Sequence, residues 1–327
     1  MNAAVPAAPA TSAAVTSPTD WLRLALPGLV WGTSFYFIAE GLRSFDPTLI
    51  TPMRVGFGFI TLSCFRAARS PIRREDRSRV VLLGLIWMAI PLTLFPFAEQ
   101  RVSSSVTGML NGATPLFVAS VASLLSRHLP PRRQLLGLSI GFLGVVLIAV
   151  PTLTEGRSSL IGVAMIVAAL CCYGFALNLA APLQQRNGAL PVLWRAQLVA
   201  TCATAPFAIP HIGDADVHVG PLLAVVALGV LGTALAFVAA AHNAGRFGST
   251  RASVTAYLIP VVALGLGAIV RDEAVAGLAV IGSAVAVLGA YLAGRSSAAH
   301  PICEAAPKPP TPASPAAAPP TPAPRSA

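Results

Sequence analysis

The chain has 327 residues, of which 55% are hydrophobic and only 10% are charged, and its mean hydropathy is +0.73. A soluble protein of this length carries roughly a quarter charged residues, so the composition excludes an ordinary soluble domain and predicts a protein that crosses the membrane several times. The net charge of +10 does not indicate a nucleic-acid-binding protein, because the basic residues lie in short segments between long apolar runs.

Residues 1–20 lack the basic region and apolar stretch of a signal peptide, and we interpret them as a disordered cytoplasmic tail. Residues 296–327 are rich in proline, which has no amide donor, and predict a second disordered cytoplasmic tail. Between the tails lie ten apolar runs, each near the roughly 20 residues that a membrane-spanning helix needs. These runs are near 22–39, 47–65, 80–98, 104–125, 135–151, 160–183, 190–210, 219–241, 252–270 and 274–294.

The basic residues between these runs predict how the chain is oriented. With both termini in the cytoplasm, 16 Lys and Arg residues fall on the cytoplasmic side, against four on the outside. Arginine greatly outnumbers lysine, and alanine, glycine and proline abound, which is typical of GC-rich codon usage. We therefore expect a multi-pass protein of a bacterial inner (plasma) membrane with both termini in the cytoplasm.

The second half of the chain repeats the first. Six pairs of identical residues are separated by 145 positions: Gly84/Gly229, Arg101/Arg246, Ser104/Ser249, Pro115/Pro260, Gly137/Gly282 and Gly144/Gly289. Nearer the N-terminus, Trp31-Gly32 faces Tyr173-Gly174 at 142, and Arg54 faces Arg195 at 141. Because each repeat holds five runs, an odd number, the second copy is expected to enter the membrane from the opposite side. The sequence thus predicts an all-α polytopic membrane protein of ten transmembrane helices in two inverted five-helix repeats, residues 21–153 and 154–295.

Two segments resemble a known family. "LVWGTSFYF" (29–37) is similar to the first helix, and "VLGTALAFVAAAHNAGRFGSTRAS" (230–253) to the eighth helix and following turn, of EamA-type permeases in the drug/metabolite transporter superfamily. Pro115 and Pro260 match its fourth and ninth helices. The resemblance covers about residues 22–294. It implies ten helices around a central cavity, and a secondary transporter that moves a small organic metabolite, such as an amino acid or a related compound, outward by alternating access.

The chain departs from the family pattern in one place. Thirteen residues after each proline the family carries Glu, often as Gly-Glu; Asp272-Glu273 fits this pattern, whereas the first repeat has Arg127-His128. Two interpretations stay open. The basic pair follows the charge pattern of cytoplasmic loops, or it marks a changed gate or a pH sensor.

Arg54 and Arg195 lie inside apolar runs, where a charge costs several kcal/mol unless it meets water, a partner or backbone carbonyls. One hypothesis is that the two arginines bind a carboxylate or phosphate in a water-filled cavity. The other is structural: each side chain reaches an interface or caps carbonyls at a helix end. All 12 Asp and Glu residues lie in tails, loops or helix ends, so we expect no carboxylate at the centre of the membrane.

Other polar or aromatic residues inside the runs are candidates to line a substrate cavity, with helix packing as the alternative for each. They are Trp31, Thr33, Asn111, Tyr173, Asn178, Thr233 and Tyr257. Pro115 and Pro260 each free a backbone carbonyl and are candidate kinks or gates.

The sequence contains no intramembrane His/Asp/Glu cluster, no metal-ligand spacing and no Walker A motif. We therefore expect a transporter rather than an enzyme, with no cofactor and no metal, whose partners are a small-molecule substrate and the lipid bilayer. The sequence leaves a monomer and a homodimer both open. The alternatives are a polytopic membrane enzyme, which would need such a cluster, and a regulatory membrane protein, which would need an output domain.

Overall fold

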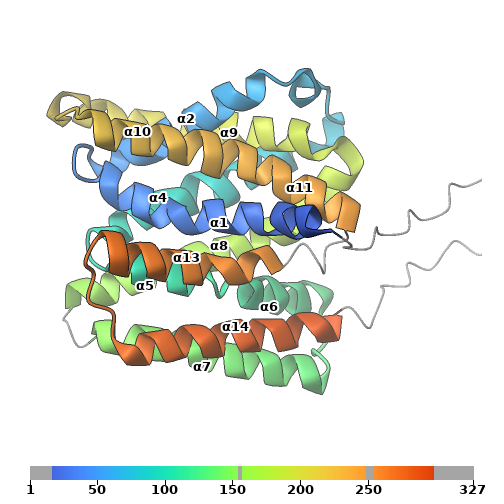
Figure 1. Ribbon diagram of the computed structural model, residues 1–327. Helices are drawn as coiled ribbons and strands as arrows, with labels where there is room; N and C mark the ends of the chain where they lie inside the picture. The colour runs from blue at the N-terminus through green and yellow to red at the C-terminus, as the bar shows by residue number, and fades with distance from the viewer. Residues whose placement is uncertain (1–16, 154–156, 248–253, 298–327) are drawn as a thin grey trace, which may run out of the picture.

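The computed structural model describes residues 17–153, 157–247 and 254–297, and helices lie in all ten predicted apolar runs (Figure 1). The predicted tails lie outside the described residues, apart from 17–20 and 296–297. The α-helices are α1 (Pro18–Gly41), α2 (Pro47–Ser63), α3 (Arg77–Leu83), α4 (Ile90–Glu99), α5 (Ser104–Asn111), α6 (Thr114–Ser126), α7 (Arg132–Leu153), α8 (Arg157–Asn187), α9 (Ala189–Ala208), α10 (Val219–Ala227), α11 (Ala236–Phe247), α13 (Val254–Val270) and α14 (Gly277–Ser297). The short elements are the 3₁₀ turns η1 (Arg66–Arg69), η2 (Arg74–Asp76) and η4 (Ile209–Asp214), and the π-helical segments η3 (Gly84–Ala89) and η5 (Leu228–Leu235).

Several of these helices are long and apolar enough to cross a membrane. Within the described residues, seven continuous helical segments meet this condition, and two shorter apolar helices, Thr255–Val270 and Gly277–Ala293, come close to it. The chain is therefore a multi-pass membrane protein, and ten crossings remain a prediction. In Figure 1 the start of α1 and the end of α14 lie at the same end of the bundle. Both termini on one side of a membrane require this arrangement.

Local sequence sets the ends of several helices. Ser17 and Asp46 accept hydrogen bonds from the first-turn amides of Asp20 and Thr48, and each of these caps is followed by proline at the start of its helix. A polar cap satisfies an amide that the helix leaves unpaired, and proline loses nothing there because its missing N–H would have been unpaired.

The two repeat-related prolines have different surroundings. Pro115 lies at the start of α6, after the break at Gly112 and Ala113 that separates α5 from α6. Pro260 lies inside the continuous α13, and its ring packs against Gly112, where a Cβ would come within 2.8 Å of it. The first proline thus marks an interruption in its predicted span, and the second supports that interruption from a neighbouring helix.

Backbone details confirm the register of the repeat. The π-helical segments η3 and η5 overlap when one is shifted by 145 residues. Arg127 and Asp272, also 145 apart, are the two non-glycine residues with positive φ in the described part of the chain, at 54° and 51°. Arg127-His128 therefore occupies the position that Asp272-Glu273 fills in the second repeat.

The last helices of the two repeats, α7 and α14, pack along their length (Figure 1). Gly137 faces Gly289 and Ala293, while Gly144 faces Gly282 and Ala286, so the two helices run antiparallel. Because Gly282 and Gly289 are the repeat counterparts of Gly137 and Gly144, each contact is the pseudo-symmetric image of the other. Glycine is required here, since an added Cβ would collide with the backbone of the facing helix.

A second set of contacts corrects the expected pairing of the two arginines. Gly84 packs against Ala196 and Val199, and its repeat counterpart Gly229 packs against Arg54 and Phe57. Arg54 therefore corresponds to Ala196, at the same 142-residue offset as Trp31 and Tyr173, and Arg195 lies one residue out of register. One residue turns a helix by roughly 100°, so Arg54 and Arg195 project from different faces.

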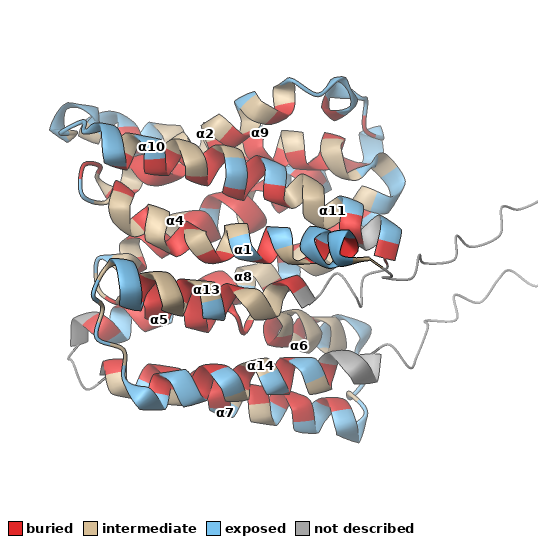
Figure 2. Cartoon of the chain, viewed as in Figure 1, coloured by how far each residue is buried: buried red, intermediate tan, exposed pale blue. Residues whose placement is uncertain are grey.

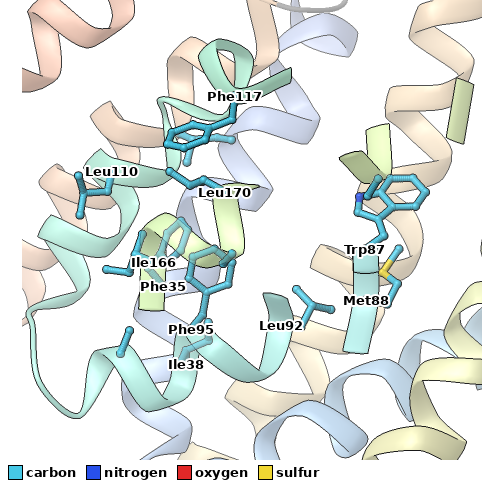
Figure 3. Packing of buried hydrophobic residues seen from close by; sticks show 14 of the residues in the cluster. Phe35, Ile38, Trp87, Met88, Leu92, Phe95, Leu110, Phe117, Ile166 and Leu170 are labelled. Carbon is cyan, nitrogen blue, oxygen red and sulfur yellow. The ribbon is translucent and has the colours of Figure 1, made fainter. Parts of the chain in front are cut away.

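Burial follows the interior of the bundle (Figure 2). Large aromatic and aliphatic side chains from several helices fill it, with Phe35 edge-on to Phe95 at 5.7 Å between ring centroids (Figure 3). Many leucines and isoleucines on the outside of the helices are exposed, among them Leu124, Leu125 and Ile269. Such an apolar surface is what a helical bundle presents to lipid.

Candidate functional site: a charged centre between the two repeats

The centre of the bundle holds a buried arginine that bridges the two repeats. Arg54, on α2, is 5% exposed, and its Nε donates to Oγ1 of Thr233 at 2.8 Å. Gln197, on α9, is fully buried and donates from Nε2 to the carbonyl oxygen of Thr233 at 2.6 Å. The π-helical segment η5 that carries Thr233 thus receives one side chain from each half, and π-bulges of this kind occur frequently at functional sites.

Aromatic rings lie beside the same segment. Trp31 donates from Nε1 to the carbonyl oxygen of Gly232 at 3.0 Å. The ring of Phe237 lies edge-on between Trp31 and Trp87, with centroid distances of 5.1 Å to each. Three aromatic side chains from α1, η3 and α11 therefore meet beside the Arg54–Thr233 bond and give this part of the centre an apolar wall.

A carboxylate lies near the arginine. Glu99 is the last residue of α4, and both its oxygens are buried with no hydrogen-bond partner among the described residues. Glu273 repels it, whereas Arg271 and, more weakly, Arg54 attract it. Phe95, one turn earlier on the same face of α4, contacts the ring of Tyr173 at 6.0 Å, and Tyr173 in turn interacts with Arg54. Glu99 lies at a helix end, as the sequence predicts, and the fold turns this helix end toward the interior of the bundle.

At the end of the bundle near Glu99, which the charge pattern predicts to face outward, Glu273 and the start of α5 form a hydrogen-bonded cluster, here called the Glu273 clamp. Glu273 accepts four hydrogen bonds from the start of α5: from the amides of Ser104 and Ser105 at 3.0 and 2.8 Å, and from both hydroxyls at 2.6 Å. Burial alone would raise the pKa of the Glu273 carboxyl, but these hydrogen bonds outweigh it and hold the pKa below its usual value. The carboxylate also faces the positive end of the α5 dipole.

The opposite end carries its own polar contacts. Arg246 pairs with Asp20 at 3.2 Å, which joins α11 to the start of α1. Asn243 and Thr255 donate to the carbonyl oxygens of Arg23 and Leu24 at 2.6 and 2.7 Å. The beginning of α1 is thereby bound to both α11 and α13.

Arg195 lies apart from this centre. Its guanidinium donates to the carbonyl of Pro191 at 3.1 Å and of Ala68 at 3.5 Å, and lies 5.3 Å from the ring centroid of Trp194. Together with Trp194 and Arg77 it lines a cleft of about 380 Å³ beside α3 and α9. These contacts fit the structural role weighed for it: capping of carbonyls near a helix end.

The other predicted residues divide between centre and packing. Trp31, Tyr173 and Thr233 lie at the centre. Asn178 donates to the carbonyls of Val118 and Gly174 and so joins α8 to α6, while Thr33 bonds its own helix at Val30. The remaining two form these contacts: Asn111 accepts from Thr114 at 2.6 Å through its backbone oxygen, and Tyr257 lies against Tyr291 at 6.4 Å.

Sequence reasoning did not single out Gln197, Trp87 or Phe237. Gln197 carried a usable signal, since a side-chain amide inside an apolar run needs a partner. The aromatic pair carried none, because tryptophan and phenylalanine are ordinary residues of a membrane helix.

Comparison with known proteins decides the family. The sequence matches the EamA-like transporter family twice, over residues 21–150 and 160–295. The chain belongs to the EamA-like transporter family. This confirms the resemblance to the drug/metabolite transporter superfamily, and the two EamA matches follow the two halves of the repeat.

Relatives of this EamA chain are named as transporters. It is 23% identical to an "Uncharacterized transporter" of Archaeoglobus fulgidus over 84% of this chain and 98% of the relative. It is 25% identical to a "Probable terminal-alkyne amino-acid exporter" of Streptantibioticus cattleyicolor over 83% and 92%. A "Probable amino-acid metabolite efflux pump" of Salmonella typhimurium is 20% identical over 84% and 95%. A solved crystal structure, 18% identical, has the same fold, with a TM-score of 0.61 over 85% of this chain and 97% of that chain.

Proposed function

We propose that this EamA-family protein is a secondary transporter that exports a small amino acid or a related metabolite across the bacterial inner membrane. The observation that carries the proposal is the Arg54–Thr233 hydrogen bond, which sets a buried charge between the two repeats. A guanidinium in such a place is a functional group by default, because its burial costs free energy that packing alone does not return. Two relatives whose names include amino-acid export support the substrate class and the direction.

Alternating access would use the polar contacts at the two ends of the bundle as gates. The Glu273 clamp on Ser104 and Ser105 would close the side predicted to face outward, and the Asp20–Arg246 pair would close the cytoplasmic side. Since the halves are inverted repeats, opening one end while closing the other exchanges the conformations of the two halves. In this scheme ten helices cross the membrane, and the tails 1–20 and 296–327 lie in the cytoplasm.

The test is direct transport. Purified protein is reconstituted into proteoliposomes loaded with a mixed pool of bacterial metabolites, and the compounds released are identified by mass spectrometry. We expect one or a few amino acids or close relatives to leave wild-type vesicles and not protein-free vesicles. Release of none of the loaded compounds would contradict the proposal.

A further inference from the structure

The charged residues near the outer end of the centre are unequally satisfied. Glu273 already accepts four hydrogen bonds from Ser104 and Ser105. Arg271 divides its charge between Glu273, at 3.4 Å, and Glu40, at 3.9 Å. Both charges therefore have an opposite charge within 4.0 Å, although the buried Nε of Arg271 makes no hydrogen bond among the described residues.

Arg54 and Glu99 are satisfied less well. Within the described residues, the Arg54 guanidinium makes one hydrogen bond, from Nε to Thr233, which leaves its two terminal NH₂ groups without a bond. Both oxygens of Glu99 are buried and unbonded. The two charges attract each other, yet no ion pair joins them within 4.0 Å. A guanidinium and a carboxyl group of the same buried region therefore each keep a vacant bonding face.

This arrangement is costly if nothing ever fills it. An unpaired carboxylate out of water loses its hydration without compensation, and so does a guanidinium that uses one of its five N–H donors. A ligand that carries a carboxylate at one end and an ammonium at the other would satisfy both groups at once. A purely anionic ligand would leave Glu99 unpaired and repelled, and a purely cationic ligand would do the same to Arg54.

We propose that Arg54 and Glu99 are the paired receptors of a zwitterionic substrate, Arg54 for its carboxylate and Glu99 for its ammonium group. Arginine suits the first role because its planar fork matches a carboxylate with two parallel hydrogen bonds. Phe95 and Tyr173, which lie between the α4 and α8 backbones near both charges, supply an apolar wall for the substrate's side chain. The inference rests on the proposed export function and specifies the chemistry of its substrate: an α-amino acid with both charged groups free.

The experiment compares three compounds with one side chain: L-phenylalanine, 3-phenylpropionate, which lacks the ammonium group, and 2-phenylethylamine, which lacks the carboxylate. A second set uses L-leucine, 4-methylpentanoate and isopentylamine. Each compound competes for efflux of the amino acid that the wild-type protein exports from proteoliposomes. We expect the zwitterion to compete at least tenfold better than either truncated compound in at least one set.

Two variants assign the ends. Glu99→Gln should remove the preference for the amino acid over the acid and keep the preference over the amine. Arg54→Gln should do the reverse. Glu99→Asp, which keeps the charge on a shorter stem, serves if the glutamine variant does not fold, and should retain the preference at reduced affinity. The wild-type comparison alone stays decisive if both arginine and glutamate variants are lost.

The outcomes separate the two proposals. A wild-type protein that exports a metabolite but prefers no zwitterion overturns the receptor pair and leaves the transporter standing. A Glu99→Gln protein that loses only its response to a pH gradient, with the amino acid-to-acid ratio unchanged, makes Glu99 a proton carrier and also overturns the pair. Export of no metabolite by the wild-type protein overturns the proposed function itself.

Discussion

Arg54 donates to Thr233 across 179 residues of sequence, from the second helix of one repeat to the π-helical segment of the other. The residue at the equivalent place in the second repeat is Ala196, which has no charge to offer. The polar centre is thus built from one half's arginine and the other half's hydroxyl, without a symmetric copy. Because of this asymmetry, we expect substitutions at Arg54 and at Arg195 to affect transport differently.

Arg54→Lys should lower transport about tenfold or more with little change in folded yield, because an ammonium keeps the charge but loses the fork that can bind Thr233 and a carboxylate together. Arg195→Lys is the matched control and should transport nearly as the wild type does, since lysine can still reach the carbonyls of Pro191 and Ala68. Initial rates of efflux, normalised to monodisperse protein on size-exclusion chromatography, measure both. Equal losses of transport in Arg54→Lys and Arg195→Lys would contradict the expected difference between the two arginines.

Glu273→Gln should open the outer end of the bundle, because a neutral amide replaces a carboxylate that accepts four hydrogen bonds and faces a helix N-terminus. A cysteine placed at the buried Val106 should then react several-fold faster with an impermeant maleimide added outside intact cells. Asp272→Asn is the control: it removes the adjacent charge, and asparagine tolerates the positive φ of that residue. An equal reaction rate in the wild type and in Glu273→Gln would show that the clamp does not close the outer end of the bundle.

The same clamp predicts a pH dependence with a definite sign. The hydrogen bonds lower the pKa of Glu273 in the folded protein, so its contribution to stability is complete above the ordinary glutamate pKa and is lost as the pH falls through the lower folded value. The difference in Tm between the wild type and Glu273→Gln should therefore be constant from about pH 5.5 to 8 and shrink only in more acidic buffer. Differential scanning fluorimetry across this range measures it. A difference that disappears already near neutral pH would show that the carboxylate is protonated there.

Gly289→Ala should destabilise the seam between α7 and α14, because the new methyl group would meet the backbone of Gly141 on the facing helix. Gly265→Ala is the matched control, since a Cβ at Gly265 meets nothing within 4 Å and alanine favours a helix by about 1 kcal/mol over glycine. We expect a lower Tm and folded yield for the first variant and an unchanged or higher Tm for the second. Equal stability of the two variants would mean that the seam relaxes without cost.

The charge pattern predicts that residues 211–218 face the outside and that residues 70–78 face the cytoplasm. Single cysteines in a cysteine-free background should react with an impermeant reagent in intact cells at 211–218, and at 70–78 only after the cells are opened. Labelling of 70–78 in intact cells would reverse the orientation, and with it the assignment of the Glu273 clamp to the outer side.

Hydropathy was enough to predict where helices lie, because a membrane span is a long apolar run with few alternatives. The repeat offsets identified Gly137 and Gly282, and Gly144 and Gly289, as counterparts. The structure adds that Gly137 contacts Gly289 and that Gly144 contacts Gly282. The site was predictable only in part. Arg54 and Thr233 stand out as polar residues in apolar runs, but their contact depends on a tertiary alignment that no local pattern contains.

Arg54 and Arg195 show why the rest of the site could not be predicted from the sequence. Two arginines 141 residues apart looked equivalent, yet the contacts of Gly84 and Gly229 set the offset at 142 in this part of the chain. An offset that is wrong by one residue is hard to detect from sequence alone. In the structure, one residue rotates a side chain by roughly 100° around its helix. Glu99 shows a similar limit, because a carboxylate at a helix end faces water or the interior according to how the helix packs.

The glycine seam carries a consequence for how such a protein could arise. One five-helix half alone would leave Gly137, Gly141 and Gly144 uncovered, and the surface that packs against them is the equivalent helix of the other half in the inverted orientation. Two separate copies inserted in opposite directions could form the same isologous contact. They could not form a centre with a single arginine, because identical halves would carry the arginine and the threonine at both equivalent positions. Two copies joined in one chain can diverge independently, and a lone buried arginine facing a threonine requires two halves of different sequence.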